Sequence, residues 1–367
     1  MIASRLVSMA RRLLETLERR GLVTWERNVP EAEVLMVTNT WPHRERPTQG
    51  PFVKETVEGL AAHGMRCDVL LIRGYRGLHA YGLGCLAVLA LPSDSCYRLV
   101  HSHGGETALV ARFFRGAPVL ASYLGTDILG PKEGSWRDRL KCVVRSRVLR
   151  THSRLMDATT TKTVEMASFL PTRVRERNWV IPDGIDRSRF RPLNRDEARL
   201  RLGWPLDEIT VISVGRRVAV KRLWLAEQAT ALAAQDLPRL RWLTISDVRH
   251  EDMVLYYNAA DCLLHTSASE GSPNVVKEAL ACDLPVVATP TGDIAELLKG
   301  VVPSALCEPR VESLAREVLR CASKRERSNG RELTGHLSLD AVAKRTLECY
   351  AALGVSAGKE RGSGGLT

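Results

Sequence analysis

The chain is most constrained by an alternation of short apolar runs with segments of helical spacing, which occurs twice along its length. In the first half, runs that predict buried strands occupy residues 34–38, 67–72, 99–103 and 118–123. Between the first two, residues 52–63 place apolar side chains at helical intervals. Strands that alternate with helices indicate a parallel sheet flanked by helices. We therefore expect an α/β fold whose first half is a doubly wound domain.

The same alternation restarts after residues 179–186. Runs at 210–215, 260–266 and 284–289 predict strands, and residues 223–234 predict a helix. A chain of 367 residues also exceeds the ~150 residues typical of one domain, which favours two. Two doubly wound, Rossmann-like domains direct the carboxyl ends of their strands into a shared cleft, where ligands of such folds bind.

These patterns divide the chain into five expected parts. Two Rossmann-like domains lie between an N-terminal amphipathic extension and a C-terminal helix that packs back on the first domain. A disordered Gly/Ser/Lys-rich tail follows. The boundaries are 1–30 for the extension, 31–190 for the first domain, 191–336 for the second, 337–354 for the helix and 355–367 for the tail.

Composition is that of a soluble globular protein, with 44% apolar and 26% charged residues. No apolar run reaches the ~20 residues of a membrane span, and no signal peptide is evident. The nine cysteines are scattered without a C-x-x-C pair, which favours reduced thiols and predicts a cytoplasmic protein.

The formal net charge of +11 is concentrated in part on residues 137–154. Basic and apolar side chains interleave there as in a basic amphipathic helix, and residues 1–20 repeat the pattern. Such helices bind anionic lipid surfaces, which predicts a peripheral position on the inner face of a membrane. The alternative is a solvated, arginine-rich helix face. Nucleic acid is not an expected partner, because no recognised reading motif accompanies the charge.

Two carboxylates, Glu270 and Glu278, flank a turn that leads into a helix. Pro273 fits the first turn of that helix, where its missing N–H costs nothing. The free N–H groups of a helix start suit an anion such as a diphosphate, and the glutamates can accept hydrogen bonds from hydroxyls. The alternative is a solvated helix start with surface glutamates. The residues predicted to surround the anion are Gly271, Ser272, Pro273, Asn274 and Val275.

A basic loop follows the predicted strand at 210–215. Gly215 leads into Arg216 and Lys221, whose positive charges can neutralise a departing diphosphate. The chain contains no D-x-D sequence, in agreement with chemistry that uses no metal. The alternative for this loop is again a solvated surface.

Together these pieces resemble the retaining glycosyltransferases of family four (glycosyl transferases group 1), which have the GT-B fold. Residues 270–278 resemble the family's E-x7-E signature, and residues 214–221 resemble its V-G-R-x4-K loop. Residues 181–192 and 291–296 are similar to I-P-N-G-V-D-x3-F-x-P and V-G-G-x-x-E, with Asp183 in place of the asparagine.

Residues 49–54, taken with 270–274, look most like teichuronic-acid-type transferases. The resemblance implies transfer of a hexose from a UDP- or GDP-linked sugar, with no further cofactor and no metal. The acceptor would be a lipid-linked sugar or a polysaccharide end in cell-surface glycan synthesis, bound by the first domain, while the second domain would bind the nucleotide-sugar donor. By the same resemblance, Glu270 would bind the donor hexose, Glu278 the nucleotide ribose, and Gly50 would let backbone approach the diphosphate.

Two departures from the family pattern lead to competing expectations. Leu124 occupies the place of a family histidine, and we interpret His101 and His103, one strand earlier, as hydrogen-bonded histidines at a strand end. Residues 240–246 run almost directly into 250–257, so a strand–helix unit of ~30 residues is missing. Either the second sheet is one strand short or neighbouring strands close up.

Three functions therefore remain open at this point. The first is a retaining glycosyltransferase. The second is a non-hydrolysing sugar-nucleotide epimerase on the same fold, against which the Arg216–Lys221 loop argues. The third is a degenerate relative that binds sugar nucleotides or partner proteins without turnover. Leu124 and the missing strand–helix unit favour this third function, and the intact glutamate pair opposes it.

Overall fold

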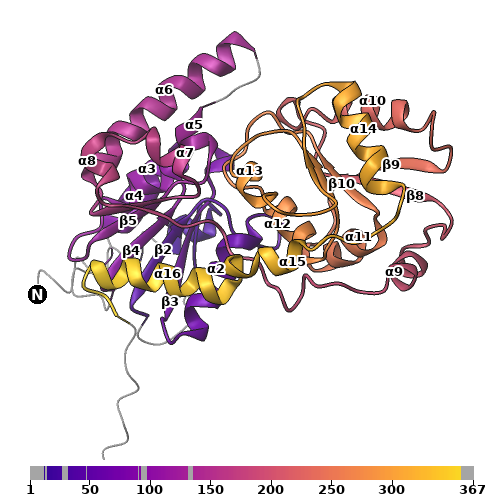
Figure 1. The fold of residues 1–367 in the computed structure, drawn as a ribbon. Coiled ribbons are helices and arrows are strands. Elements are labelled where there is room, and N and C mark those ends of the chain that lie inside the picture. Colours follow the sequence, from indigo (N-terminus) through magenta and orange to yellow (C-terminus); the bar gives the residue numbers. More distant parts are fainter. Residues whose placement is uncertain are drawn as a thin grey trace, which may run out of the picture.

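A computed structural model shows two parallel-sheet α/β domains side by side (Figure 1), which confirms the predicted fold class. It describes residues 12, 15–26, 32–46, 48–89, 91, 97–130 and 135–356. The rest of the expected extension, and residues 357–367 of the expected tail, lie outside the described residues. Val355, which we placed in that tail, is instead buried against the first domain.

The first sheet has seven strands in the order β1-β3-β2-β4-β5-β6-β7. All neighbours in it are parallel except β1, which runs antiparallel to β3. The strands are β1 Val23–Glu26, β2 Val34–Thr38, β3 Cys67–Ile72, β4 Leu99–His103, β5 Val119–Ser122, β6 Ala158–Thr161 and β7 Asn178–Val180.

Strand β1 corrects the assignment of residues 1–30 to an extension. Val23 is fully buried and pairs with Ile72, so residues 23–26 belong to the first domain. A four-residue strand at a sheet edge is too short for its periodicity to stand out, although Val23, Thr24 and Trp25 are residue types that favour strands.

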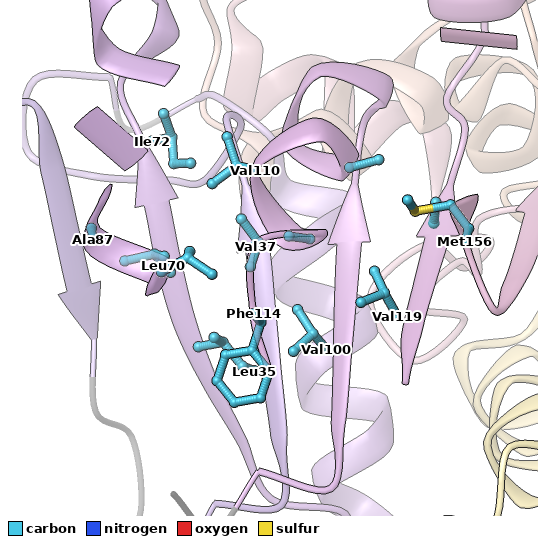
Figure 2. Packing of buried hydrophobic residues seen from close by; sticks show 14 of the residues in the cluster. Leu35, Val37, Leu70, Ile72, Ala87, Val100, Val110, Phe114, Val119 and Met156 are labelled. Atoms are coloured by element: carbon cyan, nitrogen blue, oxygen red, sulfur yellow. The ribbon is translucent and has the colours of Figure 1, made fainter. Parts of the chain in front are cut away.

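Alternate residues of β2 point to opposite faces of this sheet, as a strand requires. Leu35 and Val37 pack on the face covered by α3 and α4, where Figure 2 shows Val110 and Phe114. Val34 and Met36 pack on the face covered by α2 and α16. The helices of this domain are α2 Pro51–Ala62, α3 His79–Leu89, α4 Gly105–Ala111, α5 Thr126–Leu129, α6 Trp136–His152, α7 Val164–Ser168 and α8 Thr172–Arg175.

The second sheet has five parallel strands in the order β12-β11-β10-β8-β9. They are β8 Ile209–Val214, β9 Leu240–Ile245, β10 Cys262–His265, β11 Val286–Ala288 and β12 Ala305–Leu306. The helices around it are α9 Arg195–Leu202, α10 Leu223–Ala233, α11 Met253–Ala259, α12 Asn274–Ala281, α13 Ile294–Leu297, α14 Val311–Ala322 and α15 Gly330–Leu333.

Strand β9 lies at the edge of this sheet. The structure describes all of residues 246–259, and they contain the 3-10 turn η4 (His250–Asp252) and α11 but no strand. The second sheet is therefore one strand short, which is the first of the two outcomes that we expected from the short interval. Only residues 246–249 separate β9 from η4, which draws η4 toward the carboxyl end of β9.

Two segments join the domains. Residues 181–194 connect β7 to α9, and the final helix α16, Leu339–Ala352, returns to pack against α2. On this return His63 Nε2 lies 2.9 Å from Asp340 Oδ1, and Tyr350 OH lies 2.7 Å from His101 Nδ1. Among the helices that the structure describes, none is long and apolar enough to cross a bilayer.

Candidate functional site

A cavity of about 890 Å³ opens between the domains at the carboxyl ends of their strands. The first domain contributes residues 45–51 except 47, and the second contributes the ends of β8 and β9, the η4–α11 segment and the start of α12. Another cavity, of about 670 Å³, lies against β12 and α14 and holds none of the predicted residues. The predicted residues that line the cavity between the domains are Gly50, Gly215, Arg216, Asn274, Val275 and Glu278.

Gly50 turns the chain into α2 at the mouth of this cavity. Its φ of 66° lies in the left-handed region, and a Cβ there would meet Thr40 Oγ1 at 2.4 Å and the Thr40 carbonyl oxygen at 2.7 Å. Only glycine fits such a position without a shift of the backbone. Pro51 then occupies the first turn of α2, a helix of 12 residues whose N-terminus faces the cavity.

The turn before α12 presses against the first domain. A Cβ on Gly271 would lie 2.8 Å from the carbonyl oxygen of Leu124, and one on Gly292 would lie 2.2 Å from that of Gly271. Pro273 is the N-cap of α12, one position before the first turn in which we expected it. The structure places Lys221, Glu270, Gly271, Ser272 and Pro273 next to the described residues that line the cavity, but not among them.

Lys221 and Glu270, from η3 (Ala219–Lys221) and the loop after β10, form an ion pair. Lys221 Nζ lies 2.6 Å from Glu270 Oε1, and both side chains are nearly four-fifths buried. Burial opposes ionisation of Glu270, but the charge of Lys221 and its hydrogen bond outweigh it and lower the pKa. Burial, reinforced by Lys221, lowers the pKa of the adjacent His265 to about 4, so this imidazole is neutral at pH 7.

Glu278 is deeply enclosed and is not a solvated surface glutamate, because only 5% of it is exposed. Its Oε1 lies 2.8 Å from His250 Nε2, and its Oε2 accepts a hydrogen bond from the Tyr257 hydroxyl at 2.7 Å. Each carboxylate oxygen has a second lone pair. Glu278 can therefore accept two further hydrogen bonds from hydroxyls in the cavity.

Arg216 lies at the rim of the cavity with a side chain that is 73% exposed. Its Nε and Nη2 donate hydrogen bonds to Asp247 Oδ1 at 3.1 and 2.8 Å. An exposed ion pair of this kind contributes only ~0–1 kcal/mol, so an incoming anion can replace Asp247 at little cost. The guanidinium offers two parallel N–H groups to a phosphate.

A buried charge cluster spans the junction beneath α12. Lys162, which follows β6, lies 2.6 Å from Asp183 Oδ1, and Lys277 of α12 donates a hydrogen bond to the Asp183 carbonyl at 3.0 Å. Burial alone would raise the pKa of Asp183, but the charges of the two lysines lower it overall. Asp183, which replaces the asparagine of the resembled motif, thus serves as counter-ion to two buried lysines from different domains.

The histidines that end β4 differ from each other. His101 lies 2.7 Å from both the Tyr350 hydroxyl and Ser122 Oγ, as expected. For His103 the prediction is wrong, because neither ring nitrogen has a hydrogen-bond partner among the described residues. Burial, reinforced by the charge of Lys162, lowers the pKa of His103 to about 3. Leu124 lies beside this strand end, within reach of Gly104.

Sequence reasoning missed four residues of this site. Asp247, His250 and Tyr257 reach the cavity from the loop after β9, from η4 and from α11, and Glu55 of α2 lies behind His250. The short interval between residues 246 and 250 was the available signal, since a brief connection holds η4 at the carboxyl end of β9. No sequence pattern pointed to Glu55.

Residues 201–324 match the model of the family described as glycosyl transferases group 1. We refer to this matched segment as the group 1 domain. This group 1 domain contains β8 to β12 and the cavity-facing turn and helix from Glu270 to Ala281.

Curated relatives extend the likeness beyond the group 1 domain. The D-inositol 3-phosphate glycosyltransferase 1 of Catenulispora acidiphila is 27% identical over 275 residues, which are 64% of this chain and 65% of that protein. TuaC of Bacillus subtilis, named as a teichuronic acid biosynthesis glycosyltransferase, is 34% identical over 158 residues, which are 38% of this chain and 40% of that protein. The alignments thus span less than two thirds of either relative.

Solved structures share the whole two-domain fold. A sucrose-phosphate synthase from Thermosynechococcus elongatus superposes with a TM-score of 0.69 at 18% identity. The superposition covers 88% of this chain and 99% of the synthase chain. HepE of Anabaena, solved with UDP and glucose, superposes with a TM-score of 0.64 at 16% identity. The superposition covers 87% of this chain and 100% of the HepE chain. The arrangement of the group 1 domain and its partner domain is therefore GT-B.

Proposed function

We propose that this chain is a retaining glycosyltransferase that transfers a hexose from a nucleotide diphosphate sugar. One observation carries the proposal: Glu278, on the first turns of α12, faces a cavity between the two domains, with Arg216 on the same rim. That arrangement offers a helix N-terminus and a guanidinium to a diphosphate and a carboxylate to hydroxyls. The group 1 domain supports it, as does the fold shared with HepE, whose structure contains UDP and glucose.

In this reaction the bond between the anomeric carbon and the diphosphate oxygen breaks, and the diphosphate leaves with the electron pair. The acceptor hydroxyl forms the new bond to that carbon and passes its proton to the departing diphosphate oxygen. Arg216 and the N–H groups at the start of α12 stabilise the charge that develops on the diphosphate. Lys221 holds Glu270 ionised and oriented, so that Glu270 can accept hydrogen bonds from the hexose.

The base of the donor nucleotide, which is UDP or GDP, would lie against the end of β9, and the ribose would lie against Glu278. Because Arg216, Lys221 and the helix end supply positive charge, the reaction would require no metal. These assignments follow the predicted roles, and the cavity-lining positions of Arg216 and Glu278 support them.

For the acceptor, we propose a lipid-linked sugar or a growing polysaccharide end at the inner face of a membrane. Helix α6 projects from the first domain (Figure 1), with Trp136, Leu140, Val144 and Val148 exposed along one side. These side chains recur every four residues, so they form a single stripe. Basic residues surround the stripe and match an anionic lipid surface; they are Arg137, Arg139, Lys141, Arg145, Arg147, Arg150 and Arg154.

A second candidate is a degenerate relative that binds sugar nucleotides without transfer. The observation that favours it is Leu124, which leaves the strand end beside His103 without a titratable side chain at that position. The two candidates differ in turnover but not in binding.

A thermal-shift panel tests the proposal that both candidates share. UDP, GDP, ADP and their sugars are added to the full chain, and the melting temperature is recorded. A nucleotide that binds only the folded state raises it by mass action, with ~2.7 kcal/mol of stabilisation at a hundred times the dissociation constant. A rise with one base and not with others supports the nucleotide site. No rise with any of them overturns it.

A further inference from the structure

His250 links a carboxylate of each domain. Its Nε2 lies 2.8 Å from Glu278 Oε1 in the second domain, and its Nδ1 lies 3.5 Å from Glu55 Oε1 in the first. Four-fifths of the imidazole is buried, and it packs against the Phe190 ring at a centroid distance of 5.2 Å. Because His250 and Glu278 both line the cavity, this chain of three side chains runs from the ligand space to the first domain.

The backbone explains why a histidine reaches this position. With only residues 246–249 between β9 and η4, the first residue of η4 lies at the carboxyl end of the sheet. Glu55 reaches the same point from the first turns of α2, whose start is held at the cavity by Gly50. The Glu55 carboxylate is almost fully buried, so its partners are restricted to what this junction supplies.

We propose that His250 is a positioning residue for the nucleotide site: it holds the Glu278 carboxylate in place and ties it to the first domain through Glu55, so that nucleotide affinity depends on the proton that His250 carries. The inference rests on the proposed function only in taking Glu278 as a nucleotide contact. A charged imidazole carries an N–H on each nitrogen, so Nε2 hydrogen-bonds Glu278 while the charge at Nδ1 forms an ion pair with Glu55. A neutral imidazole has one N–H and no charge, so it keeps the hydrogen bond to Glu278 and loses the ion pair with Glu55.

The charged groups around His250 come from several elements. Glu278 of α12 and Glu55 of α2 favour its protonated form, and Arg189 of the interdomain connection opposes it. Arg189 Nη1 lies 2.9 Å from Glu55 Oε1 and also pairs with Asp186. Tyr257 of α11 shares Glu278. On the side of η4 itself, Arg249 pairs with Glu251 and Asp252.

The balance of these groups gives the direction of the pH effect. Burial lowers the pKa of His250, but the hydrogen bond and charge of Glu278, with the charge of Glu55, raise it overall. Burial raises the pKa of Glu55 to about 7. As the pH rises through the pKa of His250, its proton is lost. The shorter contact, to Glu278, retains the remaining N–H, and the bridge to Glu55 is broken.

The experiment measures the dissociation constant of UDP and of GDP by calorimetry across pH 5.5–9 on the full chain. His250→Gln keeps one hydrogen-bonding amide, but it cannot be charged. We expect it to bind about tenfold more weakly near neutral pH, as for the loss of a charged hydrogen bond, and its affinity should no longer fall at alkaline pH. Glu55→Gln removes a charge that favours His250 protonation. It should move the alkaline loss of affinity to lower pH.

Matched controls separate this effect from general damage. His79→Gln alters an exposed histidine of α3 and should leave the whole pH profile unchanged. Circular dichroism and melting curves verify folding of every variant. Wild-type affinity and pH profile in both His250→Gln and Glu55→Gln would overturn the inference and leave the nucleotide site standing. If the wild-type chain binds neither nucleotide at any pH, the proposed function fails and the inference fails with it.

Discussion

Lys221 Nζ lies 2.6 Å from Glu270 Oε1, so two residues that the sequence placed in one reaction are already paired with each other. The pairing has a consequence for both. Lys221 is not free to meet a phosphate unless Glu270 takes another partner, and the charge of Lys221 is the largest of the effects that lower the pKa of the buried Glu270. The donor hexose, with several hydroxyls, can supply the replacement partner for Glu270.

Removing Lys221 tests this relationship. Lys221→Met leaves the enclosed carboxylate of Glu270 without its cation, so the pKa of Glu270 rises. A group with a depressed pKa is ionised above that pKa, so the acid limb of the pH–rate profile should move to higher pH. At neutral pH the rate should fall by about a hundredfold, the usual loss for a preorganised charge. The exposed Lys324→Met is the control. An unshifted acid limb would show that Lys221 does not control the ionisation of Glu270.

Glu278→Gln should weaken nucleotide binding without unfolding the chain. Two ribose hydroxyls bound by a carboxylate contribute ~1.5 kcal/mol each or more, so affinity should fall by about a hundredfold. Glutamine is preferable to alanine, because alanine would also leave His250 and Tyr257 without a buried partner. Glu58→Gln, on the exposed side of α2, is the matched control. Undiminished affinity in Glu278→Gln would remove the ribose assignment.

The buried cluster at Asp183 predicts a stability effect that is separate from activity. Asp183→Asn removes the carboxylate that is ion-paired with the buried Lys162 and that most favours the charged form of the buried Lys277, which should cost ~3–5 kcal/mol. Since the pKa of Asp183 is lowered in the folded state, its contribution is complete above its unfolded pKa and is lost as the pH falls through the folded value. The free energy of unfolding, measured with urea, should therefore differ less between Asp183→Asn and wild type at pH 3 than at pH 7. The exposed Asp207→Asn should be neutral. An equally stable Asp183→Asn would contradict this account.

Chelation should leave the activity intact. Arg216, Lys221 and the start of α12 are expected to neutralise the leaving diphosphate, so turnover in excess EDTA should equal turnover without it. The measurement is the initial rate before and after dialysis against EDTA. A loss that magnesium or manganese restores would show that a metal ion carries the charge.

Helix α6 predicts salt-sensitive binding to anionic membranes. Each basic residue near an anionic leaflet contributes ~1 kcal/mol, and salt screens that contribution. The wild-type chain should float with anionic liposomes at low salt, less at high salt, and not with neutral ones. Leu140→Ser with Val144→Ser removes half of the apolar stripe and should reduce flotation without a change in stability, because both side chains are exposed. Equal failure with both lipids would leave α6 as a solvated surface.

Periodicity was sufficient for seven strands, β2 to β5, β8, β10 and β11, because each is a short run that is buried almost throughout. β2 and β3 are buried at every residue, and their sequences are apolar almost throughout. β1 was not predicted, because it has only four residues and pairs with the sheet only at its edge. Its place in the sheet depends on β3, which lies far from it in sequence.

In the candidate site too, the sequence predicted what neighbouring residues determine and missed what contacts between distant residues determine. Glu270, Glu278 and the turn between them are contiguous, so their spacing could be interpreted directly. The enclosure of Glu278 depends on His250 and Tyr257, and the bridge to Glu55 depends on the contact between domains. Such contacts are set by tertiary packing. His103 was misjudged for the same reason, since its neighbour His101 has partners from α16 and β5 that His103 does not reach.

The most direct test of the account is turnover of a nucleotide sugar. The full chain is incubated with UDP- and GDP-linked hexoses and with liposomes that carry lipid-linked sugar acceptors, and both the released nucleoside diphosphate and the hexose-extended acceptor are quantified. The account predicts equal amounts of the two products from one donor class, and neither product from Glu270→Gln under the same conditions. Nucleotide binding without either product, or equal turnover in Glu270→Gln, would contradict it.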